Sequence, residues 1–234
     1  MLSSAFEALK TYDWGTDRAV LAPIDEAVIS TRDHEGARRE LEASLAAVLG
    51  TNVSRDAKDY VCRKLMVIGT AASVDALARL LPEKDHSHMA RFALARIPAP
   101  EAAAAMRNAL GTLNGELKVG VISSLGARGD EASVAAISEL LTSDDPQVAR
   151  AAALALGDIR NAAAAQALAA AKPADPEVMR AVVDGRLACA EQLLSSGDKS
   201  AAMALYKPML GPNQPKQVRL AATRGMLACT GQKE

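Results

Sequence analysis

The sequence has 234 residues, of which 50% are hydrophobic but only 3% are aromatic, and its 27 basic and 28 acidic residues leave a formal net charge of −1. This balance excludes a global electrostatic attraction to nucleic acid or an anionic membrane, and no apolar run approaches the roughly 20 residues that cross a bilayer. The alanine-rich, aromatic-poor composition favours closely packed helices over a β-rich core.

The N-terminal stretch, residues 1–37, is predicted to form a helical cap on a single continuous repeat array that spans residues 38–234. We expect one helix at residues 3–12, a turn at 14–17 and a second helix at 18–31. The first repeat helix is expected at 38–49. Phe6, Tyr12 and Trp14 are three of the six aromatic residues. Because the end of a repeat array exposes its core, we interpret them as capping side chains. The alternative is a docking surface, since Trp and Tyr are enriched in interface hot spots.

A recurring phrase predicts one type of helix throughout the rest of the chain. Its clearest copy runs from Asp145 to Gly157. Asp144 or Asp145 can cap this helix, and Pro146 suits its first turn. Gly157 suits the left-handed position that ends a helix. Gly69 and Gly126 are expected to end helices in the same way.

The copies of this phrase begin at residues 60, 89, 117, 148, 178 and 218, in steps of 29, 28, 31, 30 and 40 residues. A second phrase, with apolar residues on one helix face, lies between them at 72–81 and 132–141, and in weaker form at 101–110 and 161–171. A step of about 30 residues is typical of a two-helix repeat, so the chain is predicted to alternate two helix types.

The pattern D-x-x-V-x-R-x-A-A-x-A-L-G, followed by a short turn and a second amphipathic helix, resembles the HEAT-like repeats of the phycobilisome-lyase type. The resemblance covers about residues 38–230. It implies an all-α fold, a right-handed α-α superhelix of about six two-helix repeats. Residues 187–210 look more like a tetratricopeptide hairpin, which predicts a longer helix pair there and accounts for the 40-residue step.

Charged residues recur at the starts of the second helices. In HEAT-like families such residues form a structural ladder, in which each Asp caps a helix and meets an Arg from a neighbouring repeat. The alternative is direct ligand binding by the arginines. The residues concerned are Asp56, Asp85, Asp144 and Asp175, with Arg91, Arg150 and Arg180.

Catalytic and metal-binding motifs are not evident. His86 and His88 begin a helix, where a separation of two residues places their rings about 200° apart and makes joint metal ligation poor. His34-Glu35 is one His-Glu pair, whereas the HEAT-fold di-iron hydroxylases need several. No phosphate-binding glycine motif occurs. We therefore expect no catalytic residue, no metal and no cofactor.

The three cysteines, Cys62, Cys189 and Cys229, are widely separated and form no C-x-x-C motif. Each lies in a helical apolar pattern, so we expect small buried hydrophobic side chains in preference to a disulfide framework or a zinc site. A reactive thiol or an intermolecular bridge is the alternative.

An apolar strip on the second helices is the predicted partner site. On the helix that follows Pro146, Val148, Ala152 and Ala155 fit the buried stripe, which leaves Ala149 and Ala153 pointing outward. If the register is off by one position, these side chains are core instead. The equivalent residues in the other copies give the predicted site: Leu94, Lys118, Ile122, Met179 and Val183.

Together these patterns favour a non-catalytic scaffold that binds a partner protein or peptide on the concave face of the array. A phycobilisome-lyase-like subunit that handles a chromophore and a purely structural repeat spacer are the alternatives. We expect neither a nucleic-acid nor a membrane partner. Residues 1–10 lack the pattern of a secretion signal, so the expected location is the cytoplasm.

Overall fold

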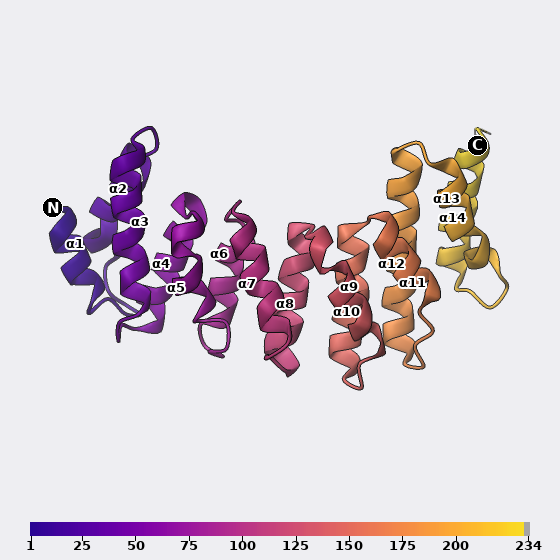
Figure 1. Cartoon of the computed structure of the whole chain (residues 1–234), viewed down its shortest axis with the longest axis horizontal. Coiled ribbons are helices and arrows are strands. Elements are labelled where there is room, and N and C mark those ends of the chain that lie inside the picture. Colours follow the sequence, from indigo (N-terminus) through magenta and orange to yellow (C-terminus); the bar gives the residue numbers. More distant parts are fainter. Residues whose placement is uncertain (232–234) are drawn as a thin grey trace. The chain divides into compact units, whose positions relative to one another are not determined.

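The computed structural model describes residues 1–231, and every regular element in that part of the chain is helical (Figure 1). The chain divides into two compact units, Met1–Leu113 and Asn114–Glu234. We therefore describe each unit by itself. The predicted boundary between residues 37 and 38 lies inside the first unit and stays a prediction.

The first unit contains seven α-helices. Two 3₁₀ turns, Arg18–Leu21 (η1) and Ala71–Ser73 (η2), precede α2 and α5. Contacts between α3 and α4 and between α4 and α6 form much of its core. The helices are α1 (Leu2–Leu9), α2 (Ala22–Ser30), α3 (Glu35–Leu49), α4 (Arg55–Ile68), α5 (Val74–Ala78), α6 (Ser87–Leu94) and α7 (Pro100–Leu110).

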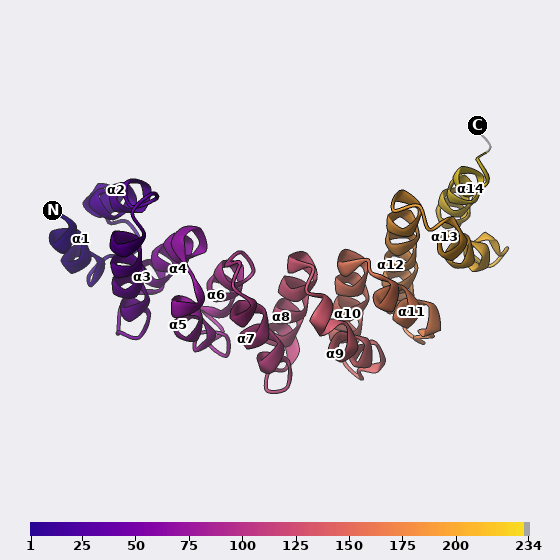
Figure 2. The ribbon, with the colours of Figure 1, turned by 45° about the horizontal axis from the view of Figure 1, so that its top comes forward.

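The described part of the second unit, residues 114–231, also contains seven α-helices. Within it α10 packs against both α8 and α12, and both views show these three helices following one another (Figures 1 and 2). The helices are α8 (Gly115–Arg128), α9 (Val134–Glu139), α10 (Pro146–Ile159), α11 (Ala162–Ala170), α12 (Pro176–Ser195), α13 (Lys199–Tyr206) and α14 (Lys216–Thr230), with 3₁₀ turns at Glu131–Ser133 (η3), Leu140–Thr142 (η4) and Lys207–Leu210 (η5).

The predicted alternation of two helix types is confirmed. The six copies of the first phrase fall in α4, α6, α8, α10, α12 and α14, and the four copies of the second phrase fall in α5, α7, α9 and α11. The helices α5 and α9 are shorter than expected, because 3₁₀ turns replace part of each predicted helix.

Local sequence explains where the second helices begin. The Asp145 carboxylate accepts a hydrogen bond from the Gln147 backbone N–H, at 2.9 Å from Oδ1, and Pro146 occupies the first position of α10. In the first unit the Ser54 hydroxyl accepts from the Ala57 N–H at 3.0 Å and caps α4. Each cap satisfies a backbone donor that has no partner inside the helix.

The expectation that Gly126 and Gly157 end their helices is wrong. Both lie inside helices, and α10 continues to Ile159; the next residue, Arg160, takes the left-handed conformation with φ 57°. A Cβ added at Gly157 would lie 2.7 Å from the Cα of Gly185, and one added at Gly126 would lie 2.7 Å from the Cα of Ala155. These glycines therefore let the backbones of successive second helices touch. Gly69 does follow the end of α4, in an extended conformation.

The longest helix of the described residues is α12, with 20 residues. It packs against α13 and α14 around Tyr206, which is 1% exposed. Burial raises the pKa of the Tyr206 hydroxyl to about 12, so the group stays neutral at physiological pH. The resemblance of this region to a tetratricopeptide hairpin stays a prediction.

Candidate functional site

The predicted apolar strip does not lie on the surface. Leu94 and Ile122 are fully buried, and Val183 is 5% exposed. Their predicted outward orientation is wrong, and the alternative that they belong to the core is correct. The reason is that a second helix has neighbours on several sides. Eight residues of α10 are buried, and together they cover more than half of the helix circumference. They are residues 148, 149, 151, 152, 153, 155, 156 and 157.

Lys118 and Met179, the other two residues of that strip, are half-buried. Met179 and Val183 belong to the hydrophobic cluster around Tyr206, so they stabilise the C-terminal helices of the second unit. The outward side of α10 instead carries Arg150 and Leu154, both exposed.

Of the four predicted ladder aspartates, Asp175 is the one that caps a helix by hydrogen bonding. Its Oδ1 accepts from the backbone N–H groups of Glu177 at 2.8 Å and Val178 at 3.0 Å. For α10 the cap is Asp145, while the neighbouring Asp144 is exposed. The cap of α4 is Ser54, with Asp56 in the first turn, and Asp85 makes no cap bond to α6.

Two of the three ladder arginines, Arg150 and Arg180, do not pair with aspartates of neighbouring repeats in the predicted way. Arg180 lies 3.5 Å from Glu177 on its own helix, and Arg150 is exposed with no ion pair among residues 1–231. Arg91 is half-buried, and burial lowers the pKa of its guanidinium from the ordinary value. A regular column of Asp–Arg pairs is therefore not formed at α10 and α12.

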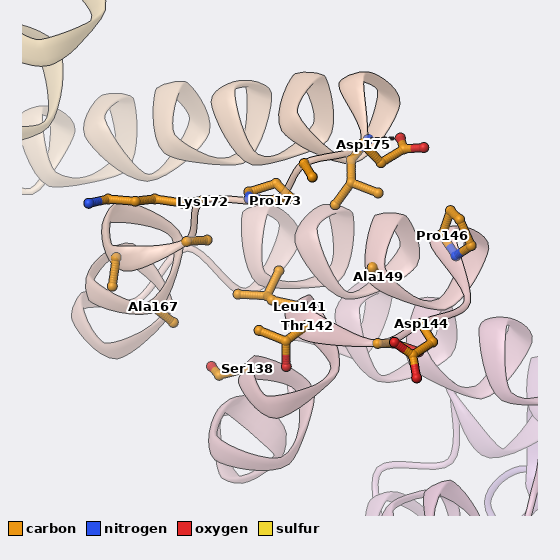
Figure 3. A pocket seen from close by; sticks show the side chains of 15 residues that line it. Ser138, Leu141, Thr142, Asp144, Pro146, Ala149, Ala167, Lys172, Pro173 and Asp175 are labelled. Carbon is orange, nitrogen blue, oxygen red and sulfur yellow. Dashed lines mark hydrogen bonds between the residues drawn. The ribbon is translucent and has the colours of Figure 1, made fainter.

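A cavity of about 620 Å³ lies in the second unit, where first helices end and second helices begin. Its walls come from the end of α9 and η4, the start of α10, the end of α11 and the segment that leads into α12 (Figure 3). The lining residues are Ser138, Leu141, Thr142, Ser143, Asp144, Pro146, Ala149, Ala167, Ala170, Ala171, Lys172, Pro173, Ala174, Asp175 and Val178.

The deep surface of this cavity is apolar. Leu141, Ala149 and Val178 are buried at its base, and Ala167 is half-buried in its wall. Figure 3 shows the Leu141 side chain in the middle of the lining residues. Because most of the lining side chains are short, space remains between the helix ends for an inserted side chain.

The polar groups of the cavity lie toward its two ends. Lys172 lies at one end, and Asp144 and Asp175 lie at the other (Figure 3). Two helix N-termini, which often bind anions, also meet this cavity. Here the carboxylates of Asp145 and Asp175 already accept hydrogen bonds from backbone N–H groups of these two N-termini. The arrangement therefore disfavours a phosphate or carboxylate ligand.

Arg186 on α12 holds the wall of the cavity in place. Its Nε donates to the Leu168 carbonyl at 2.8 Å, and its Nη2 donates to the carbonyls of Ala169 at 3.0 Å and Ala171 at 3.1 Å. Burial lowers the pKa of this guanidinium from its ordinary value. These bonds give side-chain donors to carbonyls at and just after the end of α11, where the helix itself supplies few donors.

Two of the three thiols and two of the three histidines have surroundings that the structure defines. Burial raises the pKa of Cys62 to about 12 and that of Cys189 to about 11, so neither forms the nucleophilic thiolate near neutral pH. His86 Nδ1 lies 2.8 Å from Glu83 Oε2, whereas the His88 ring stacks on Phe92. Among residues 1–231 no group of three or more His, Cys, Asp or Glu residues is placed to hold a metal ion.

Sequence reasoning missed the cavity, although a weak signal for it exists. Both Asp145-Pro146 and Asp175-Pro176 start a second helix, and each follows a short loop after a first helix. These dipeptides predict the helix starts. They do not predict that two such loops leave a hollow between them, because this depends on how far apart α10 and α11 lie.

Solved structures similar to this chain include an engineered protein, at 17% identity over 98% of this chain and 69% of the other, with a TM-score of 0.49. Another is human deoxyhypusine hydroxylase in complex with glycerol, at 14% identity over 98% and 96%, with a TM-score of 0.37. No curated protein sequence matches.

The described part of the chain contains no helix that is both long and apolar enough to cross a membrane. The sequence model of one family, HEAT repeats, matches residues 103–185, which include α8 to α11. With the alternation of helices on both sides of this range, the described part of the chain has the fold of a HEAT-like helical repeat.

Proposed function

We propose that this protein is a non-catalytic interaction scaffold, and that the cavity of its second unit receives apolar side chains of a partner protein. The observation that carries the proposal is the cavity of about 620 Å³ with an apolar base. Its volume is in the range of about 300–1,000 Å³ that is typical of binding pockets. The proposed class of function is the predicted one, but the partner is anchored in this cavity and not on the second-helix strip.

The energetics of such an anchor support a protein partner. Burial of one leucine-sized side chain against the base contributes about 1.5–3 kcal/mol, so one or two anchors with backbone contacts suffice for a moderate affinity. The walls are formed by helix ends whose backbone groups are already bonded, including those held by Asp175 and Arg186. The site therefore changes little when a partner binds, which lowers the cost of ordering.

The charges around the cavity define the partner further. Asp144 and Asp175 lie near the entrance against one cation, Lys172. A neutral or basic segment next to the apolar anchor fits this balance, whereas an acidic segment is disfavoured. A chromophore that carries carboxylates, as a bilin does, is disfavoured for the same reason.

The absence of a catalytic step is part of the proposal. The raised pKa values of Cys62 and Cys189 support it, because a buried protonated thiol is a poor nucleophile.

A display experiment tests this proposal directly. A library of peptides displayed on phage is selected on the full chain, and the enriched peptides are synthesised and titrated against three proteins by isothermal calorimetry. The first is the wild type. The second is Ala170→Glu, which places a carboxylate in the exposed wall of the cavity. The third is Ala163→Glu, an exposed position of the same helix that does not line the cavity.

We expect the enriched peptides to share an apolar residue with a neutral or basic neighbour. Their affinity should fall at least about tenfold for Ala170→Glu, because the new carboxylate must be desolvated beside the anchor, and stay unchanged for Ala163→Glu. Equal affinity for all three proteins, or selection that enriches no peptide, contradicts the proposal. Circular dichroism of both variants checks that the helices are intact.

A further inference from the structure

A tryptophan of the first unit lies almost completely in solvent. Trp14 is 92% exposed, which contradicts the interpretation of this residue as part of a packed cap. The turn that carries it is closed by a hydrogen bond from the Thr16 N–H to the Asp13 carbonyl at 3.0 Å, and Gly15 adopts φ +84°. The Trp14 N–H also donates to Asp13 Oδ1 at 2.9 Å. The indole is thus presented on an ordered turn.

The chain beside this turn is tied to α4. The Ser54 hydroxyl, which caps α4, donates to the Tyr12 carbonyl at 2.5 Å. The rings of Tyr12 and Tyr60 lie 6.4 Å apart between centroids. One hydrogen bond and one ring contact of Tyr12 therefore hold the backbone that leads into this turn against α4. The backbone that carries this exposed aromatic side chain is thus ordered before a partner binds, which lowers the cost of binding.

A cavity of about 460 Å³ lies between this turn and α4. It combines aromatic rings with charged groups of both signs. Its lining residues are Tyr12, Asp13, Trp14, Gly15, Thr16, Arg18, Asp56, Asp59, Tyr60 and Arg63.

The two cations of this cavity already have anionic partners. Arg63 Nε lies 3.0 Å from Asp59 Oδ2, and Arg18 Nη2 lies 3.7 Å from Asp25 Oδ2. By contrast, neither Asp13 nor Asp56 forms an ion pair within residues 1–231. Two carboxylates therefore face the cavity without a positive partner, next to an exposed indole.

Tyr60 also lines this cavity, but its hydroxyl and its ring are already engaged by other residues. Its hydroxyl donates to Asp25 Oδ1 at 2.9 Å and to the Leu21 carbonyl at 3.2 Å. Its ring already faces the Lys64 ammonium, 4.8 Å from the centroid. The aromatic surface left for a second molecule is that of Trp14 and the half-buried Tyr12.

We propose that this cavity binds a lysine or arginine side chain of a partner protein, with the cation against the Trp14 ring and near the carboxylates of Asp13 and Asp56. A cation is attracted to the face of an indole, and it also compensates the two unpaired carboxylates. An anionic ligand gains neither interaction, since Arg18 and Arg63 are already paired. The site lies in the first unit and does not depend on the cavity of the second.

Fluorescence tests this site without a label, because Trp14 is the one tryptophan of the chain. The full protein is titrated with a blocked pentapeptide that has a central arginine. The controls are the same peptide with citrulline, which is neutral and of the same shape, and with glutamate. We expect the arginine peptide alone to shift the Trp14 emission, with an affinity on the order of 1 mM that weakens as salt is added.

Two protein variants connect the shift to the carboxylates. The first is the double variant Asp13→Asn/Asp56→Asn, which removes both charges. Its amide oxygen at position 13 can still accept a hydrogen bond from the Trp14 N–H. We expect its affinity for the arginine peptide to fall at least about fivefold. Asp33→Asn, an exposed position outside the cavity, is the matched control and should bind like the wild type.

The proposal is overturned if the citrulline peptide produces the same shift as the arginine peptide, if the double variant binds as tightly as Asp33→Asn, or if the emission does not change up to about ten times the expected dissociation constant. Unchanged circular dichroism of the double variant shows that a loss of binding is not a loss of fold.

Discussion

The two units contain the same alternation of helices but hold them together in different ways. In the second unit the close contacts depend on missing side chains, since Gly157 meets the backbone of Gly185 and Gly126 meets Ala155. In the first unit, polar side chains connect the helices. A HEAT-like sequence can therefore bring its helices together either through small residues or through satisfied buried polar groups.

The polar connections of the first unit are specific. Glu42 on α3 is 1% exposed, and its carboxylate accepts from the Thr70 N–H at 2.6 Å and from the Thr70 hydroxyl at 2.9 Å. Asp25 on α2 accepts from the Tyr60 hydroxyl and forms an ion pair with Lys64, and both partners lie on α4. Unsatisfied groups of this kind would cost about 1–3 kcal/mol each, so these bonds also select the correct packing.

The largest expected effect concerns residues that are buried alike in both units. Leu94→Glu in the first unit and Ile122→Glu in the second should each lower the free energy of unfolding by more than about 3 kcal/mol, because a carboxylate enters a fully buried apolar site. Urea unfolding followed by circular dichroism measures this. The half-buried Lys118→Glu is the control, with a change below about 1 kcal/mol. Wild-type stability in Leu94→Glu or Ile122→Glu would show that these positions are not core.

The next effect separates the two kinds of packing. Gly157→Ala should lower the free energy of unfolding by about 1–3 kcal/mol, because the new methyl group collides with the Gly185 backbone, which cannot move away as a flexible side chain can. Gly36→Ala on α3 is the matched substitution, with no atom within 4 Å of the added methyl group. Here the helix propensity of alanine should raise stability by up to about 1 kcal/mol.

Thermal melts of these two glycine variants measure the difference in sign. If both substitutions stabilise the protein, the backbone contact between α10 and α12 is not tight, and the contrast between the two units disappears.

The smallest effect concerns the polar connection between α2 and α4. Burial raises the pKa of the Asp25 carboxyl, but hydrogen bonds from Lys64 and Tyr60 and the charges of Lys64 and Arg18 outweigh burial and bring that pKa below its ordinary value of 3.8. A lowered folded-state pKa means that the ionised carboxylate stabilises the fold above pH 3.8, and that this contribution is lost as the pH falls through the folded-state pKa.

The stability difference between wild type and Asp25→Asn should therefore be constant near neutral pH and shrink as the pH falls below 3.8. Urea midpoints across this pH range provide the measurement. A difference that grows toward acid would mean that the Asp25 pKa is raised in the folded protein.

The Tyr60 hydroxyl contributes to the same connection. Tyr60→Phe should lower the free energy of unfolding by about 0.5–1.5 kcal/mol at neutral pH, because the Leu21 carbonyl and Asp25 lose a hydrogen-bond donor. Urea midpoints at neutral pH measure this loss.

The helices themselves were predictable because their signals are local. Apolar spacing along one helix, an Asp before Pro146 and an Asp before Pro176 each act within a few residues, and the structure has helices at these places. The predicted stripe of Val148, Ala152 and Ala155 is buried as expected, but Leu94 and Ile122 were misplaced because the buried face of the second helices is wider than one stripe. Alanine-rich helices invite this error, because apolar side chains occur around most of their circumference.

The sequence by itself determined the alternating helices, the aspartate caps of α10 and α12 and the HEAT-like character of the repeats, since propensity, capping and periodicity depend on neighbouring residues. The tertiary structure decided which faces are buried, that Gly126 and Gly157 are contact points instead of helix ends, and where the two cavities lie. These properties depend on the distance between helices that are far apart in sequence. The exposed Trp14 belongs to this second group, because the hydrogen bond between Ser54 and the Tyr12 carbonyl joins residues 42 positions apart.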